Sequence, residues 1–188
     1  MRARATTLVC LLGLVACKSS SVPGSNPPQL VTELYEAGPT AADSGASIDA
    51  SNVTITLERT VCYGVCADYT VTLHGDGAVE YVGRQFVGRR GRVTDRIAPD
   101  DVAELVKKLD AAHFDRLSVP VPCPKGMATD NPTAILTVDR GGGRSHRVEH
   151  YHGNFCAPPE LDVLEVAVDE VARTSRWTSC APSEFCAR

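Results

Sequence analysis

The sequence predicts an α+β domain in which hairpins form an antiparallel sheet with two helices packed on it. Between residues 53 and 151, several segments alternate apolar and polar residues, the pattern of half-buried strands. Two other segments, one after Ala98 and one after Pro159, repeat apolar residues at helical spacing. The expected order is ββββ-α-ββ-α, and no parallel crossover is indicated, so the sheet is antiparallel throughout.

Six strands are expected, each with apolar side chains on one face. They cover residues 53–58, 69–73, 79–86, 93–97, 133–139 and 146–151. The second and third strands are separated by Gly75-Asp76-Gly77, and Asp-Gly between alternating segments is a strong hairpin signal. The fifth and sixth strands form a second hairpin around the glycines at 141–143.

Two helices complete the domain. Pro99 suits the first position of a helix, and the acidic residues that follow it favour the positive N-terminal end. Its apolar stripe consists of Val102, Leu105, Val106 and Leu109. The last helix begins after Pro158-Pro159, with Leu161, Leu164, Val168 and Val171 facing inward. The acidic residues of this helix are expected to face water: Asp162, Glu165 and Asp169.

The first residues of the chain have the features of an export signal. Arg2 and Arg4 precede an apolar run at residues 8–16, and Cys17 follows directly. The run is far shorter than the roughly 20 residues that span a bilayer. This segment resembles the lipobox of bacterial lipoproteins, which implies cleavage before Cys17 and a diacylglycerol on its thiol.

This resemblance sets the expected domain organisation and location. Residues 1–16 are the signal peptide, 17–51 are the lipidated cysteine with a flexible Ser-, Pro- and Gly-rich tether, and 52–188 are a single α+β domain. The protein is then held in the bacterial cell envelope by its lipid. Lys18 gives no signal for inner-membrane retention, so the outer membrane is expected, with the domain facing the periplasm or the surface.

Charge and motifs exclude several classes of function. The whole chain has a net charge of −4, and losing residues 1–16 removes two arginines and no acid, giving −6. A dedicated nucleic-acid binder normally carries a basic balance, so nucleic acid is not an expected partner. The chain has no phosphate-binding loop, nucleophile elbow or H-E-x-x-H sequence. A non-enzymatic protein without a cofactor is therefore expected.

Six cysteines remain after Cys10 is removed with the signal and Cys17 is lipidated. An even number in an exported chain indicates disulfides. The six are Cys62, Cys66, Cys123, Cys156, Cys180 and Cys186. Sequence order alone does not fix the pairing, but local geometry favours Cys62–Cys66, Cys123–Cys156 and Cys180–Cys186. Cys123 and Cys156 flank the second hairpin, whose outer ends meet.

Cys62 and Cys66 also allow two functional interpretations. A thiol oxidoreductase needs C-x-x-C at a helix N-terminus, whereas this pair is C-x-x-x-C between two strands. Thiolates select Cu(I), and the spacing resembles copper chaperones that help to assemble cytochrome oxidase. A structural disulfide that clips the turn is the simplest of the three interpretations.

Three of the five histidines lie in or beside the sixth strand, where alternate residues share a face. His146, His150 and His152 are therefore candidate ligands for zinc, which takes three or four such ligands. Asp130 or His113 could complete the set, and a zinc-bound water could support hydrolysis. The alternative is that these histidines lie at the surface or bond to loop carbonyls. Val148, in the middle of the same face, favours the alternative.

The turn between the first two strands carries the pattern R-x-x-C-x-G-x-C-x-x-Y, from Arg59 to Tyr69. This pattern resembles a family of uncharacterised bacterial envelope proteins, many of them lipoproteins. The resemblance continues through residues 75–77, 129–133 and Trp177, and covers roughly residues 52–178. Ala67 stands where the family usually has proline. The resemblance implies no activity.

Five arginines surround the second turn and are a candidate site for anions. They are Arg84, Arg89, Arg90, Arg92 and Arg96. Clustered guanidinium groups can bind phosphate or carboxylate, including an anionic envelope component, although a solvated hairpin is the commoner explanation of such a turn. The expected function is thus a lipid-anchored envelope protein that binds a partner protein or has a structural role. The alternative is a zinc- or copper-binding envelope protein, or a metal-dependent hydrolase.

Overall fold

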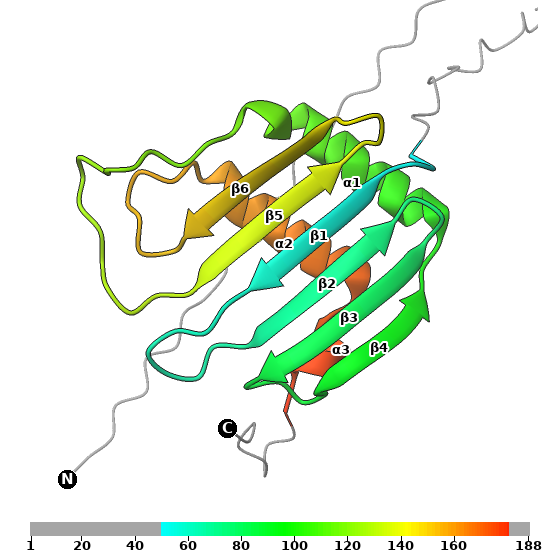
Figure 1. Ribbon diagram of the computed structural model, residues 1–188, viewed down its shortest axis with the longest axis horizontal. Helices are drawn as coiled ribbons and strands as arrows, with labels where there is room; N and C mark the ends of the chain where they lie inside the picture. Colours follow the sequence, from blue (N-terminus) through cyan, green and yellow to red (C-terminus); the bar gives the residue numbers. More distant parts are fainter. Residues whose placement is uncertain (1–49, 181–188) are drawn as a thin grey trace, which may run out of the picture. The chain divides into compact units, whose positions relative to one another are not determined.

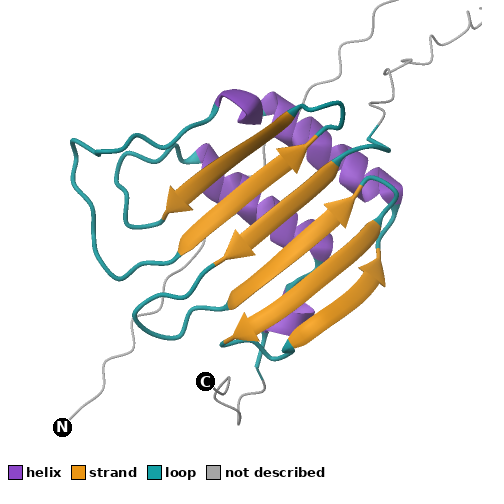
Figure 2. Ribbon diagram, in the orientation of Figure 1, coloured by secondary structure: helices purple, strands orange, loops and turns teal. Residues whose placement is uncertain are grey.

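The computed structural model describes residues 50–180, which form a six-stranded antiparallel sheet with helices on one face (Figures 1 and 2). The strands are β1 (Thr54–Arg59), β2 (Asp68–His74), β3 (Ala78–Gln85), β4 (Gly91–Arg96), β5 (Thr133–Asp139) and β6 (Ser145–Tyr151). The helices are α1 (Pro99–Ala111), the 3-10 turn η1 (Phe114–Arg116), α2 (Glu160–Ala172) and α3 (Ser175–Thr178). The predicted α+β class and order of the main elements are confirmed, and η1 and α3 are additional short turns.

The first strand lies in the middle of the sheet. The strand order is β4-β3-β2-β1-β5-β6, so β1 pairs with β2 on one side and β5 on the other. Arg59, at the end of β1, is the register partner of Tyr69 in β2 and Ala134 in β5. The chain thus builds a four-stranded meander, crosses through α1, and returns as a hairpin to the free edge of β1.

The core lies between one face of the sheet and helices α1 and α2. On the sheet side it contains Ile55, Leu57, Val71, Leu73, Val79, Tyr81, Leu136 and Val138. On the helix side it contains Val102, Leu105, Val106, Leu109, Leu161, Leu164 and Val168. The threonines that alternate with these strand residues, such as Thr56 and Thr72, lie on the opposite face. One packed and one solvated face is the usual arrangement of an antiparallel sheet.

The turn between β2 and β3 depends on Gly77, which has a φ of +85°. A Cβ at this position would lie 2.3 Å from the carbonyl oxygen of Ile97. The Asp76 carboxylate accepts a 3.0 Å hydrogen bond from the Ala78 amide. The hairpin predicted from Gly75-Asp76-Gly77 is therefore formed, and the positive φ explains why glycine is needed there.

Two of the three predicted disulfides lie within the described residues, and both are formed. Cys62–Cys66 closes the β1–β2 loop, and Cys123–Cys156 joins the loop before β5 to the loop after β6. The third predicted pair involves Cys186, which lies outside the described residues, as do Cys17, the signal peptide and most of the tether. Among residues 50–180, no helix is long and apolar enough to span a bilayer.

The prediction that Glu165 faces water is wrong. Its side chain is only 1% exposed, whereas that of Asp162 is 61% exposed. Glu165 lies four residues after Leu161 and three before Val168, so helical spacing places it on the inward stripe of α2. Val171, predicted to face inward, is half-buried.

Candidate functional site

A network of charged side chains lies between α2 and one end of the sheet. Arg59 and Tyr69, which are neighbours across β1 and β2, both reach Asp169 on α2. The Arg59 guanidinium donates to Asp169 Oδ2 at 2.9 Å, and the Tyr69 hydroxyl donates to Oδ1 at 2.5 Å. Thr174 also donates to Oδ1, at 2.8 Å. The first and last residues of the R-x-x-C-x-G-x-C-x-x-Y pattern thus fix the sheet to α2.

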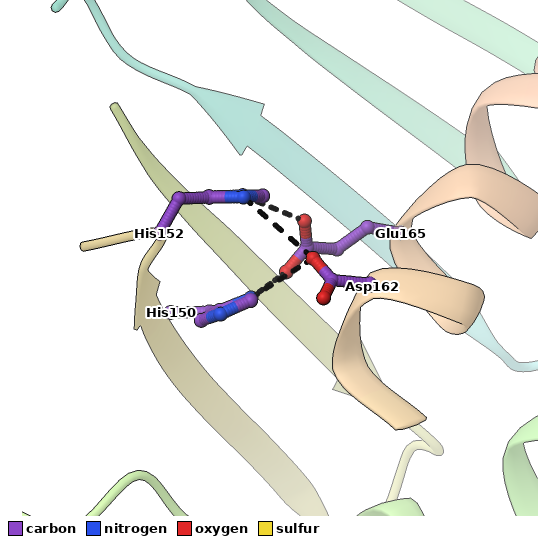
Figure 3. Close-up of side chains that lie close together, drawn as sticks. All are labelled: His150, His152, Asp162 and Glu165. Carbon is purple, nitrogen blue, oxygen red and sulfur yellow. Dashed lines mark hydrogen bonds and ion pairs between the residues drawn. The ribbon is translucent and has the colours of Figure 1, made fainter. Parts of the chain in front are cut away.

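Glu165, one helical turn earlier on α2, is the buried centre of this network (Figure 3). Its Oε1 contacts His150 Nδ1 at 2.7 Å, and its Oε2 contacts His152 Nε2 at 3.0 Å. Arg59 Nη1 approaches Oε2 at 3.3 Å. A buried carboxylate is costly unless it is paired and hydrogen-bonded, and here three cationic or polar groups surround it.

Asp162 lies on the solvent side of the network. It completes a group of four side chains with His150, His152 and Glu165. Its Oδ1 lies 3.6 Å from His152 Nδ1 and 3.9 Å from His150 Nδ1. The two imidazole rings stack with their centroids 4.4 Å apart. One nitrogen or oxygen from each of His150, His152, Asp162 and Glu165 lies within 4.8 Å of each of the others. These four side chains are the histidine–carboxylate cluster.

The charges in this cluster stabilise one another. Burial raises the pKa of Glu165, but the hydrogen bonds from His150 and His152 and the nearby charges of His150 and Arg59 together lower that pKa to about 2. The hydrogen bond with Glu165 also raises the pKa of His150, against the opposite effect of burial. The pair therefore favours an ionised carboxylate beside a protonated imidazole, which neutralises the charge of Glu165.

Not all of the predicted metal ligands lie in the histidine–carboxylate cluster. The structure brings His150 and His152 together but places His146 elsewhere, with its Nε2 2.9 Å from the Leu117 carbonyl oxygen. The His146 ring also packs edge-on against Phe114. Sequence reasoning missed Asp162 and Glu165, although their spacing of three residues on a helix places them on one face.

The arginines around the second turn are largely paired with carboxylates. Arg84 contacts Asp68 at 2.6 Å and Glu58 at 3.2 Å. Arg92 contacts Glu80 at 2.6 Å, and Arg96 contacts Asp76 at 3.1 Å. Because these acids balance the positive charge locally, this hairpin has less free charge for an anion than its sequence indicates.

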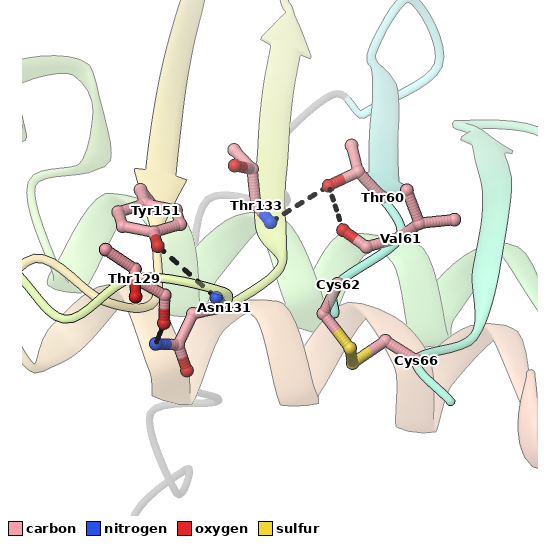
Figure 4. Close-up of a disulfide and its surroundings, with 8 residues drawn as sticks. All are labelled: Thr60, Val61, Cys62, Cys66, Thr129, Asn131, Thr133 and Tyr151. Carbon is pink, nitrogen blue, oxygen red and sulfur yellow. Dashed lines mark hydrogen bonds between the residues drawn. A yellow bond between two sulfur atoms is a disulfide. The ribbon is translucent and has the colours of Figure 1, made fainter. Parts of the chain in front are cut away.

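A second feature of the molecule is the end of the sheet that carries both disulfides. Figure 4 shows Cys62–Cys66 and the side chains around it. We call residues 60–67, 117–132 and 152–159 the stapled loops. Thr60 and Thr133 exchange two 3.0 Å hydrogen bonds, and the Tyr63 amide donates to the Asp130 carbonyl at 3.2 Å. Cys123–Cys156 links the other two loops. The three loops are therefore tied to one another by covalent and hydrogen bonds.

The stapled loops expose large apolar side chains. They are Val61 (44% exposed), Tyr63 (89%), Val65 (67%), Val121 (80%), Met127 (51%) and Phe155 (58%). Among residues 50–180, the other large apolar side chains that are as exposed are Val163 and Val166 on α2. Apolar residues gathered at one end of a domain are typical of an interaction surface. Sequence reasoning missed this surface because it is assembled from three separate loops.

The disulfides also bear on the interpretations of the cysteines. A sulfur in a disulfide offers no thiolate to a metal or a substrate. Cys62 and Cys66 lie between two strands and clip a loop, as expected of a structural pair. This geometry supports the structural interpretation of these two cysteines.

The model of the family described as a domain of unknown function, DUF6438, matches residues 53–172, which include β1 to β6, α1 and α2. No curated protein is a significant match to the chain.

Proposed function

Since the chain belongs to the DUF6438 family, a domain of unknown function, we propose a function from its own residues: a lipid-anchored, non-enzymatic binding module of the bacterial envelope. The anchor rests on the sequence around Cys17. Arg2 and Arg4, the short apolar run, and Ala16 directly before Cys17 are the features of a lipoprotein signal. A cysteine carrying two or three acyl chains gives stable membrane attachment, whereas one chain does not.

The observation that carries the binding role is the apolar surface of the stapled loops. Tyr63 and Phe155 expose aromatic rings, and Met127 adds a flexible thioether. Aromatic residues and methionine are enriched in protein interfaces. The loops that carry these residues are held by disulfides and by hydrogen bonds between the loops, so little conformational entropy is lost on binding.

The partner proposed for this surface is another protein of the envelope. A membrane surface is the competing occupant, but residues that bind anionic lipid headgroups are usually accompanied by several basic side chains. Within the stapled loops the only lysine or arginine is Lys125, and Asp130 offsets its charge. An apolar, disulfide-held surface with little net charge fits a protein with complementary apolar pockets.

The anchor is tested by Cys17→Ser in the full-length chain. Wild-type protein is expected in the membrane fraction, and the variant in the soluble fraction, because it has no thiol to acylate. Mass spectrometry of the mature wild-type protein should show a modified Cys17 at the amino terminus. Membrane association that survives Cys17→Ser, or an intact amino terminus, would contradict the anchor.

The binding surface is tested by site-specific photo-crosslinking in intact envelopes. A photoreactive residue replaces Tyr63 or Phe155 in the stapled loops, and Val163 serves as the control because it is exposed on α2. We expect both loop positions to give the same protein adduct and position 163 to give none of it. Phe155→Ser should then reduce the adduct formed from position 63. Adducts with lipid only, or equal adducts from all three positions, would overturn the proposal.

A further inference from the structure

We propose that the histidine–carboxylate cluster is a binding site for a divalent transition-metal ion, with Zn²⁺ as the best-matched ion. This inference does not depend on the exposed apolar side chains of the stapled loops, although His152 is the first residue of the third loop. It rests on four observations: the types of ligand atom, their distances, their charges and their burial.

The ligand set suits zinc. His150 and His152 supply imidazole nitrogens, and Asp162 and Glu165 supply carboxylate oxygens. Zinc is bound by these groups, commonly four at a time in a tetrahedron. A softer ion such as Cu(I) prefers sulfur ligands, and the cysteines of the stapled loops are held in disulfides. Two nitrogens with two oxygens therefore point to a borderline divalent ion.

The distances are close to those that zinc requires. Metal–ligand bonds of about 2.0–2.2 Å in a tetrahedron place the ligand atoms about 3.3–3.6 Å apart. His152 Nδ1 and His150 Nδ1 lie 3.6 Å and 3.9 Å from Asp162 Oδ1. Glu165 contacts His150 through the same Nδ1 at 2.7 Å but contacts His152 through Nε2 at 3.0 Å, so His152 would offer only one of its two nitrogens to the ion. With one atom taken from each side chain, the four ligand atoms lie within 4.8 Å of one another, so an ion would draw the more widely spaced atoms closer to reach tetrahedral spacing.

The charges also balance. The carboxylates of Asp162 and Glu165 together match the charge of a divalent ion bound with two neutral imidazoles. The nearby guanidinium of Arg59 has its own partner, because it contacts Asp169 at 2.9 Å. Arg59 also contacts Glu165 Oε2 at 3.3 Å and can orient that carboxylate from outside the ligand set. Such outer partners hold metal ligands in position.

Two of the four ligands are buried and two are partly or largely exposed to solvent. The side chains of Glu165 and His150 are 1% and 5% exposed, so they lie on the protein side. The side chains of His152 and Asp162 are 26% and 61% exposed, and lie on the solvent side (Figure 3). An ion can therefore enter past Asp162 and reach the buried ligands without the core opening.

The site is tested on the full mature chain, purified without a histidine tag and treated with EDTA before dialysis. Titration with Zn²⁺ by isothermal calorimetry should give one site with a dissociation constant of about 1 μM or below. Co²⁺ should give the visible absorption of a four-coordinate ion, which Zn²⁺ then displaces. These readouts do not involve a partner protein, so their result is separate from that of the crosslinking test.

The variants are chosen on the exposed side of the cluster so that the domain stays folded. His152→Ala and Asp162→Asn should each weaken Zn²⁺ binding at least about tenfold and together abolish the Co²⁺ spectrum. Matched controls are His146→Ala, a histidine of the same strand outside the cluster, and Glu160→Gln, an exposed acid of the same helical turn. Both controls should bind as the wild type does. Equal binding by controls and cluster variants, or no binding by folded wild-type protein, would overturn the proposal.

Discussion

Replacing Arg59 with methionine tests whether the charged network stabilises the fold. Methionine keeps most of the apolar stem but removes the cation that contacts Glu165 and Asp169. Removing one partner of a buried ion pair costs about 3–5 kcal/mol, because the other charge stays buried. Here the histidines still contact Glu165, and the side chains of Arg59 and Asp169 are 21% and 20% exposed. We therefore expect a loss of about 2–3 kcal/mol in the free energy of unfolding.

Arg84→Met is the matched control, because Arg84 lies on the same sheet and also contacts two acids. Its side chain is 35% exposed and that of its partner Glu58 is 41% exposed, so the expected loss is about 1 kcal/mol or less. Both variants are compared with the wild type by urea unfolding in EDTA without reductant, followed by circular dichroism. For a domain of this size, at about 3–4 °C per kcal/mol, a loss of about 2–3 kcal/mol corresponds to a fall in Tm of about 6–12 °C.

A second substitution separates the loss of charge compensation from general disruption. Glu165→Gln removes the buried charge that Arg59→Met leaves behind. The double variant should therefore lose less stability than the sum of the two single variants, with a coupling of at least about 0.5 kcal/mol. Additive losses, or an Arg59→Met variant no less stable than Arg84→Met, would refute the reasoning.

Two other predictions concern the turn and the disulfides. Gly77→Ala should destabilise the domain by about 1–3 kcal/mol in urea unfolding, because the φ of +85° and a carbonyl 2.3 Å from the new Cβ both oppose it. An unchanged midpoint would contradict this account of the turn. Replacing both cysteines of Cys123–Cys156 by serine should cost about 4 kcal/mol, against about 2 for Cys62–Cys66, because the loops span 33 and 4 residues. The opposite ranking, measured in the same way, would show that loop length does not govern their contributions.

Local patterns in the sequence predicted the sheet well. Alternation at residues 133–139 matches the bounds of β5, and Pro99 marks the start of α1. The prediction for Glu165 was wrong because its charge suggested a solvent-facing side chain, whereas its position on the helix faces inward. Leu161, Glu165 and Val168 have the spacing of one helical stripe, which places a charged residue in the core.

Of the four residues of the histidine–carboxylate cluster, the sequence predicted the two histidines but not the two carboxylates. His150 and His152 are close in sequence, so strand geometry brings them together. Asp162 and Glu165 join them through the packing of α2 on the sheet, a long-range contact that local periodicity does not encode. The six exposed side chains of the stapled loops come from three segments in the same way. Only the fold shows that these segments share one end of the sheet.

The central place of β1 has a consequence for folding. Among the described strands, β1 leaves a ribosome or an export channel first. It has two edges that must pair, one with β2 and the other with β5. Until residue 139 has emerged, that edge presents unpaired amide and carbonyl groups, which can pair with another chain. A fragment that ends after α1 would therefore keep the meander but be prone to aggregation, whereas removal of β4, at the sheet margin, would expose only the edge of β3.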